Sequence, residues 1–275
     1  MAYRSHMVSE YSSPTRSGRG RLEGKRVIVT GAARGIGADI AACFAAEGAR
    51  LAVVDILGAE VAEVAASLGA VPVSGDLRVP DAARATIATA IDALDGVDVL
   101  VNNAGVLRFS SILDMESEEW DLMFEINARS MLFTTQAVVR RMVKQAGDGG
   151  PGMAGVRACA GKIVNMASMG GKLGSPGQAH YCASKAAVIA FTRVSAMEFG
   201  PYGINVNCIC PGFVLTEMGA GTRTPEMVAA WSSTSPLGRL AEPSDVSRTA
   251  LFLASSDSDY CTGQAINVSG GMVMH

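Results

Sequence analysis

Several common sequence signals are missing from this chain of 275 residues, and each absence excludes a class of protein. No run of about 18 apolar residues is long enough to span a bilayer, so we expect no contact with a membrane. The net charge of −3 lacks the basic excess that binds nucleic acid. None of the six cysteines forms a CxxC pair. We therefore expect buried free thiols in a reducing cytoplasm, with no metal site.

Residues 1–21 differ from the rest of the chain. They are rich in serine and arginine and have no apolar periodicity, and the letters SHM before Val8 resemble a cloning remnant, with Met7 as the natural start. A mitochondrial transit peptide has a similar composition, but Glu10 and the lack of an amphipathic face argue against one. We expect a disordered tail and a solvated basic arm, made of Arg16, Arg19, Arg21, Lys25 and Arg26.

From residue 22 onward, short apolar runs alternate with alanine-rich helical stretches. The predicted strands are 26–30, 51–55, 71–74, 97–101, 162–167, 204–209 and 264–268. The predicted helices are 36–48, 59–69, 80–94, 116–145, 180–199 and 243–254. Strands this apolar are buried on both faces, which is typical of a parallel sheet between two layers of helices. The pattern predicts one domain over 22–275, an α/β fold with a doubly wound, seven-stranded parallel sheet and helices on both faces, Rossmann-like.

Two segments interrupt the alternation. Residues 146–161 are rich in glycine and alanine, which predicts a surface loop between a helix and the next strand. Residues 213–236 contain no clear strand, and we expect a mobile excursion with one short helix, TPEMVAAW, that has Pro225 in its first turn.

A glycine-rich turn joins the first predicted strand to the first helix. Gly31, Gly35 and Gly37 follow Thr30 in the order GxxxGxG. Glycine permits a tight turn and lets backbone N–H groups approach a pyrophosphate at the amino terminus of a helix. Such turns also occur for purely structural reasons, so the position directly after the first strand is what favours a dinucleotide site.

Polar residues end the next three predicted strands. Asp55 ends the second, where a carboxylate can accept hydrogen bonds from both hydroxyls of an adenosine ribose, although it could instead cap the next helix. Asp76 follows the third strand, where the adenine ring is expected, unless it only forms a turn. After the fourth strand, we expect Asn102 to tie neighbouring strands together and Asn103 to Gly105 to line the cofactor.

The stretch HYCASK places Tyr181 four residues before Lys185, and Ser168 precedes both. Residues four apart lie on one face of a helix. An adjacent ammonium group lowers the pKa of a phenol from its usual value near ~10, which suits proton transfer. A core tyrosine beside a surface-reaching lysine would carry no such chemistry. Together with TGAARGIG, NNAG and CPGFVLTEM, these residues resemble the short-chain dehydrogenase/reductase family over residues 22–275.

The resemblance implies a role for each matching residue. Tyr181 would be the general acid/base, Lys185 would lower its pKa and hold the nicotinamide ribose, Ser168 would bind the substrate oxygen, and Asn127 would position a water that leads to solvent. The residues expected to bind the cofactor, besides Tyr181 and Lys185, are Gly31, Arg34, Gly35, Ile36, Gly37, Asp55, Asp76, Leu77, Asn103, Ala104, Gly105, Pro211, Gly212, Val214 and Thr216. The resemblance also implies a homotetramer, paired through its long helices and through its last helix and strand.

We therefore predict an NAD(H)-dependent oxidoreductase that interconverts a secondary alcohol and its ketone. Asp55 favours NAD over NADP, whereas Arg34 in the glycine turn could favour NADP. The alternatives within this class are a 3-oxoacyl-carrier-protein reductase and a hydroxysteroid or hydroxy-acid dehydrogenase. A non-catalytic nucleotide-binding scaffold is the alternative from another class, and the intact Ser168, Tyr181 and Lys185 argue against it.

The residues expected to line the substrate are largely apolar, with a few hydroxyl groups; they include Met169, Leu173, Met218, Thr222, Met227 and Trp231. No arginine is clearly placed to hold a carboxylate, and the terminal SGGMVMH resembles the ends of sugar-alcohol dehydrogenases in the family. A polyol or simple secondary alcohol is therefore favoured over a hydroxy acid. We expect His180, beside Tyr181, to be a bystander.

Overall fold

The chain is described by a computed structural model over residues 20–147, 159–218 and 224–275. Seven strands form one sheet in the order β3-β2-β1-β4-β5-β6-β7, and all neighbouring strands are parallel. The strands are β1 (Arg26–Thr30), β2 (Arg50–Asp55), β3 (Val71–Ser74), β4 (Val99–Asn102), β5 (Gly161–Met166), β6 (Ile204–Pro211) and β7 (Ala265–Val268). The predicted seven-stranded, doubly wound parallel sheet is confirmed.

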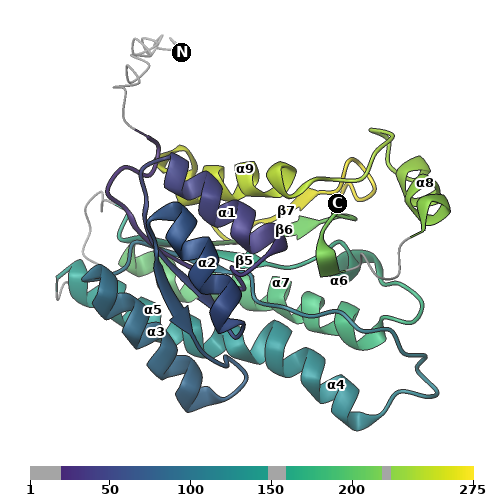
Figure 1. Cartoon of the computed structure of the whole chain (residues 1–275), viewed down its shortest axis with the longest axis horizontal. Coiled ribbons are helices and arrows are strands. Elements are labelled where there is room, and N and C mark those ends of the chain that lie inside the picture. Colours follow the sequence, from purple (N-terminus) through teal and green to yellow (C-terminus); the bar gives the residue numbers. More distant parts are fainter. Residues whose placement is uncertain (1–19, 148–158, 219–223) are drawn as a thin grey trace, which may run out of the picture.

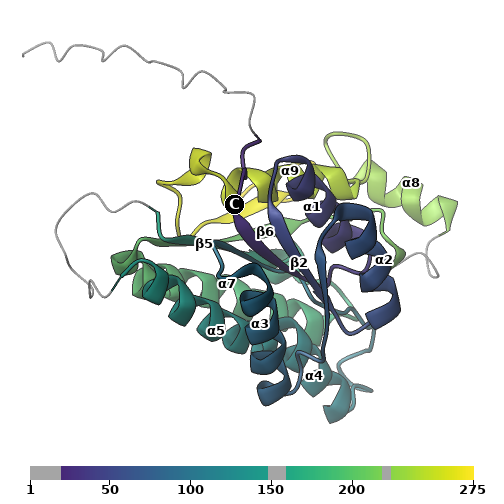
Figure 2. The same cartoon turned by 60° about the vertical axis from the view of Figure 1, so that its left-hand side comes forward.

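Helices cover both faces of the sheet (Figure 1), and the two layers separate clearly in Figure 2. One layer contains α1 (Gly35–Ala46), α2 (Gly58–Leu68) and α9 (Pro243–Ala254). The other contains α3 (Pro80–Leu94), α5 (Ser130–Gln145) and α7 (Ala179–Phe199). Along β1, Val27 and Val29 enter the first core and Ile28 enters the second. Because successive side chains point to opposite faces of a strand, this double burial requires continuously apolar strands.

The helix predicted over 116–145 is divided into three segments. They are α4 (Ser117–Phe124), a π-helical turn η1 (Glu125–Arg129) and α5. The shorter helical elements elsewhere are α6 (Gly170–Leu173), α8 (Pro225–Ser233) and the 3₁₀ turns η2 (Gly200–Tyr202) and η4 (Ser256–Ser258). The expected short helix with Pro225 in its first turn is confirmed as α8, and Thr224 caps it by accepting a hydrogen bond from the N–H of Met227 at 3.3 Å. The short helix α6 was not predicted from the sequence.

The prediction of a solvated basic arm is wrong for Arg21 and Arg26. The backbone N–H of Arg21 donates to Glu47 at 2.7 Å, and its guanidinium pairs with Asp257. The guanidinium of Arg26 forms two hydrogen bonds to the carboxylate of Asp98, at 2.8 and 2.9 Å. Carboxylates near the amino-terminal edge of the sheet therefore hold this part of the chain, and the folded region includes the last two residues of the expected tail. The other expected tail residues, 1–19, lie outside the described chain, as do 148–158 and 219–223 of the two expected loop segments.

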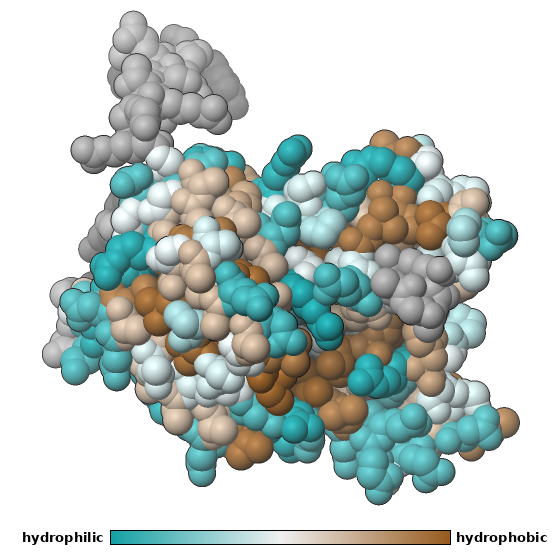
Figure 3. All heavy atoms as spheres, in the orientation of Figure 1, coloured by the Kyte–Doolittle hydropathy of each residue, from teal (hydrophilic) through white to brown (hydrophobic). Residues whose placement is uncertain are grey.

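Because all strands run in one direction, their carboxyl ends lie along a single edge, near α6 and α8 (Figure 1). Figure 3 shows apolar surface gathered in a hollow on this side of the molecule. Exposed apolar side chains on the segments at this edge are Phe109, Ile112, Leu113, Leu173, Leu215 and Met218. Within the described ranges, no helix is long and apolar enough to cross a membrane.

Candidate active site

The chain order reverses at β1, which lies between β2 and β4 in the sheet. In open α/β sheets, ligands bind outside the carboxyl ends of the strands at such a point. The residues predicted for cofactor and catalysis, except Asn127, end or follow strands at this edge or lie near the start of the next helix. The structure therefore brings together residues that are up to about 185 positions apart in the sequence.

The glycine turn is built against the end of β4. Gly31 and Gly35 have φ of 65° and 59°, a left-handed conformation that side chains disfavour. A Cβ at Gly31 would lie 2.7 Å from the Cα of Ala104, and one at Gly37 would lie 2.1 Å from the carbonyl oxygen of Gly31. No described side chain caps the start of α1, so the N–H groups of its first turn can face an anion. This cradle fits the pyrophosphate of a dinucleotide.

Two asparagines of the NNAG motif stabilise this edge. The amide of Asn102 donates to Asn165 Oδ1 at 2.9 Å and so ties β4 to β5, as predicted. The amide of Asn103 donates to the carbonyl oxygens of Thr30 and Gly31, at 3.1 and 2.9 Å. Asn103 therefore fixes the glycine turn, which is a structural role that the sequence did not suggest.

Asp55 faces the glycine turn from the end of β2. Its carboxylate accepts hydrogen bonds from the N–H groups of Ala33, at 3.0 Å, and Leu57, at 3.1 Å. The second contact forms a turn just before α2, and the amino terminus of α2 has no side-chain cap, so the capping interpretation is not borne out. Each carboxylate oxygen has a further lone pair, and the group can still accept ribose hydroxyls.

Asp76 forms a turn with Arg78, which was the alternative interpretation of this residue. The carboxylate accepts hydrogen bonds from Arg78 Nε and Nη2, at 3.0 and 2.6 Å. The hydrogen bonds from Arg78 lower the pKa of Asp76. Leu77, between the two, is nearly buried.

The predicted catalytic residues lie close together at the ends of β5 and the start of α7. Tyr181 is in the first turn of α7, and its ring lies beside the hydroxyl of Ser168: a Cβ at Gly170 would lie 3.4 Å from Ser168 Oγ and 3.5 Å from Tyr181 Cε1. The ammonium of Lys185 lies 5.8 Å from the centre of the Tyr181 ring. Lys185 is only 4% exposed, and its Nζ donates to the carbonyl oxygen of Met166 at 2.8 Å.

The charges in this cluster differ from the expectation. Burial raises the pKa of Tyr181, and the nearby hydroxyl of Ser168 opposes this rise. Burial also lowers the pKa of Lys185, to about 8. The expectation that Lys185 lowers the pKa of the phenol is not met in this structure, because the ammonium bonds to a carbonyl and is itself destabilised by desolvation.

Asn127 lies in the π-helical turn and is fully buried. Its side chain exchanges two hydrogen bonds with the backbone of Val106, at 2.8 and 3.0 Å, and donates a third to the hydroxyl of Ser184 at 3.1 Å. Ser184, which the sequence interpretation missed, in turn donates to the carbonyl of Tyr181. A Cβ at Gly105 would lie 3.0 Å from Asn127 Oδ1 and 3.4 Å from Lys185 Nζ, so Gly105 lies between the two polar groups.

The segment after β6 reaches over the glycine turn. The carbonyl of Pro211 accepts a hydrogen bond from Met169, the N–H of Gly212 donates to Val268, and Val214 forms a bridge with Ala241. A Cβ at Gly35 would lie 3.5 Å from the Thr216 side chain. Ile36 is half-buried in the first turn of α1, under this segment.

One of the expected substrate-lining residues, Trp231, is held by a stacking contact that the sequence did not reveal. Trp231 of α8 stacks on Phe213, with the ring centres 4.6 Å apart and the planes at 9°. Leu173 and Met218 are more than half exposed, and Thr222 lies outside the described residues. His180 is fully buried, and neither ring nitrogen has a hydrogen-bond partner in the described chain.

The six cysteines are free, as expected, but only three are buried: Cys182, Cys208 and Cys210. Cys43, Cys159 and Cys261 are half-buried, because they lie on outer helices and loops. Over the described ranges, no group of three potential metal ligands occurs.

Comparisons with known proteins agree with this geometry. A family model described as enoyl-(acyl carrier protein) reductase matches residues 31–273. Galactitol 2-dehydrogenase of Agrobacterium fabrum is 38% identical over 91% of this chain and 98% of its own. The 3-oxoacyl-[acyl-carrier-protein] reductase of Thermotoga maritima is also 38% identical, over 92% of this chain and 100% of its own. A short-chain type dehydrogenase/reductase from Mycobacterium marinum superposes with a TM-score of 0.83 at 34% identity, over 92% and 97% of the two chains.

The chain belongs to the short-chain dehydrogenase/reductase family. It is an oxidoreductase, and members of this family generally use NAD or NADP. The glycine cradle, Asp55 and the free first turn of α1 fit such a nucleotide.

The buried ammonium leads to a stability prediction. Because the pKa of Lys185 is about 8 in the folded protein and 10.5 ordinarily, the folded state holds its proton less tightly. Below pH 8 the folded protein keeps the buried charge of Lys185. Its free energy of unfolding then rises as the pH increases from about 8 towards 10.5. Lys185→Met should therefore raise the free energy of unfolding at pH 7 by roughly 1–3 kcal/mol, and this gain should shrink towards pH 10.

Urea unfolding at both pH values, without nucleotide, measures this difference. Lys144→Met, at an exposed lysine of α5, is the matched control and should change little at either pH. If Lys185→Met instead lowered the free energy of unfolding by the same amount at pH 7 and at pH 10, the hydrogen bond to Met166 would outweigh the cost of desolvation.

Proposed function

We propose that this short-chain dehydrogenase/reductase is NAD(H)-dependent and interconverts a secondary alcohol, of the polyol or sugar-alcohol kind, with its ketone. The observation that carries the proposal is the cluster of Ser168, Tyr181 and Lys185 at the edge where Asp55 faces the glycine turn. A scaffold protein that only binds nucleotide does not require a phenol, a hydroxyl and a buried ammonium near one another.

The nicotinamide ring, when bound, supplies the hydride acceptor for oxidation and the hydride donor for reduction. Ser168 holds the substrate oxygen through its hydroxyl. Tyr181 takes the proton from the alcohol oxygen at its own phenolic oxygen, and returns it in the reverse direction. Both side chains lie beside Gly170, so a substrate oxygen can be held between them.

Lys185 supports this proton transfer by its charge. Since burial raises the pKa of Tyr181, a neighbouring cation is needed to make the phenolate accessible near neutral pH. Movement of the ammonium from the Met166 carbonyl towards the ribose hydroxyls and the phenol would provide it. Asn127 Oδ1 and Lys185 Nζ both lie close to Gly105, and we assign to Asn127 the water that would return the proton towards solvent.

The choice of NAD follows from Asp55. Charged hydrogen bonds to two ribose hydroxyls contribute ~1.5–3 kcal/mol each, whereas the 2′-phosphate of NADP would place a second anion against this carboxylate. Arg34 could hold that phosphate, but it lies on a turn with its side chain 63% exposed. We assign the selection to Asp55, which the end of β2 fixes in place.

The polyol substrate is favoured over two alternatives. Relatives at 38% identity carry the names galactitol 2-dehydrogenase and 3-oxoacyl-[acyl-carrier-protein] reductase, so similarity does not choose between them. Asp55 favours NAD, whereas a 3-oxoacyl reductase usually uses NADPH. The expected lining residues carry no described arginine for a carboxylate, which disfavours a hydroxy acid.

Tyr181→Phe should lower kcat by about 10²–10⁴-fold, because the ring still packs but the proton relay is lost. The affinity for NADH, measured by fluorescence titration, should change little. A variant that keeps more than about a tenth of the wild-type kcat would contradict the role of Tyr181.

Wild type should prefer NAD over NADP by on the order of 10²-fold in kcat/KM, and Asp55→Ala should remove most of that preference. The measurement is kcat/KM for both nucleotides on one substrate. A wild-type preference for NADP, or an unchanged ratio in Asp55→Ala, would show that this carboxylate is not the selector.

A panel of substrates separates the proposed reaction from its alternatives. We expect NAD-dependent oxidation of galactitol or a related polyol to be faster than NADH- or NADPH-dependent reduction of a 3-oxoacyl thioester. Turnover of the thioester alone, with NADPH, would favour the carrier-protein reductase, and no turnover of any alcohol or ketone would favour the scaffold.

We also propose a homotetramer in the cytoplasm. Exposed apolar side chains on α4, α5 and α7, among them Trp120, Leu132, Val194 and Met197, support burial against further copies of the chain. Light scattering at micromolar concentration should give the mass of four chains, and a stable monomer would contradict this assembly.

A further inference from the structure

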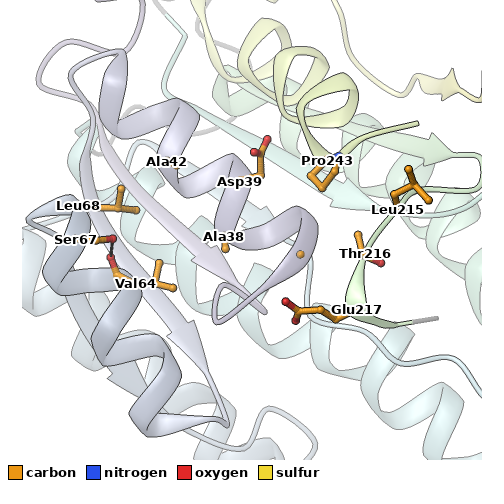
Figure 4. A pocket seen from close by; sticks show the side chains of 11 residues that line it. Ala38, Asp39, Ala42, Val64, Ser67, Leu68, Leu215, Thr216, Glu217 and Pro243 are labelled. Carbon is orange, nitrogen blue, oxygen red and sulfur yellow. Dashed lines mark hydrogen bonds between the residues drawn. The ribbon is translucent and has the colours of Figure 1, made fainter. Parts of the chain in front are cut away.

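An ion pair joins the glycine turn to the segment after β6. Nε of Arg34, the residue before α1, lies 3.9 Å from Oε2 of Glu217. Figure 4 shows the carboxylate of Glu217 directed towards the first turn of α1 across a groove of about 630 Å³, which Gly35 and Thr216 also line. The pair therefore spans the turn that is proposed to hold the pyrophosphate.

Arg34 lies between two carboxylates. On one side, the N–H of the preceding residue, Ala33, donates to Asp55 at 3.0 Å. On the other side is Glu217. A 2′-phosphate on an adenosine ribose bound at Asp55 would need a cation within reach, and Arg34 is a candidate because the residue before it is bonded to Asp55.

The neighbouring arginine at the adenosine end is also held by a carboxylate. Arg78 follows β3, which pairs with β2, and Asp76 binds its guanidinium at 2.6 Å through Nη2. Release of either guanidinium requires the loss of its carboxylate partner. The Asp76 pair closes a turn within three residues, whereas Glu217 reaches Arg34 from a distant segment of the chain.

We propose that Glu217 is a specificity-determining residue, which holds Arg34 away from the 2′-position of the adenosine ribose and so strengthens the preference for NAD. This inference rests on the proposed use of NAD through Asp55. Asp55 favours the free 2′-hydroxyl directly, while Glu217 acts by occupying the guanidinium of Arg34, which could otherwise bind a 2′-phosphate.

The size of the effect follows from the exposure of the pair. Both side chains are about two thirds exposed, at 63% and 66%. Ion pairs of this kind contribute a small free energy, which corresponds to a change in affinity of roughly two- to fivefold. Glu217→Gln should therefore lower the Kd for NADPH by roughly two- to fivefold, with a smaller change for NADH.

The experiment measures binding rather than turnover. Kd values for NADH and NADPH come from fluorescence titration, and those for AMP and adenosine 2′,5′-bisphosphate come from calorimetry. The variants are Glu217→Gln, Arg34→Ala and the double variant. Glu226→Gln, which removes one exposed negative charge from α8, is the matched control.

We expect tighter binding of the two 2′-phosphorylated ligands in Glu217→Gln only, and no such gain when Arg34 is absent. An equal gain in Glu226→Gln, or a gain that persists in the Arg34→Ala background, would overturn the inference, since net charge would then explain it. Unchanged Kd values in Glu217→Gln, in a protein whose wild type prefers NADH, would also overturn the inference. A wild type that binds NADPH more tightly than NADH would instead contradict the proposed function itself.

Discussion

The buried ammonium of Lys185 is the constraint on which the rest of the site depends. Burial of a charge is costly, and here one hydrogen bond, to the carbonyl of Met166, partly compensates for it. The backbone around Lys185 is packed tightly: a Cβ at Gly171 would lie 2.7 Å from the carbonyl carbon of Lys185. A side chain at position 171 would therefore displace the backbone of α7 that carries Lys185.

The parallel sheet supplies the remaining geometry. Since every strand ends at one edge, Asp55, Asn103, Ser168 and Pro211 reach a common region from four different strands. Hydrogen bonds between neighbouring strand ends, such as those of Asn102 and Asn103, then fix the turns that bear the cofactor residues. The fold therefore positions the site through hydrogen bonds at the strand ends, and the segment after β6 adds the partly exposed Leu215 and Met218.

The sheet and its order of elements could be predicted from the sequence because double burial makes each strand apolar throughout, as Val27, Ile28 and Val29 show. Three kinds of feature could not. The π-helical turn at Asn127 keeps helical periodicity, and α6 has only four residues, two of them glycine. The carboxylate partners of Arg21 and Arg26 lie 236 and 72 residues away. The pKa of Tyr181 depends on burial and on where the ammonium of Lys185 points, which helical spacing alone does not determine.

A crystal structure of the protein with NAD bound tests the central claim most directly. The account predicts that the ammonium of Lys185 lies within hydrogen-bonding distance of the nicotinamide ribose hydroxyls, next to the phenol of Tyr181, and that Asp55 accepts both hydroxyls of the adenosine ribose. A dinucleotide bound with Lys185 still directed only at the Met166 carbonyl, or with its adenosine ribose away from Asp55, would contradict the account.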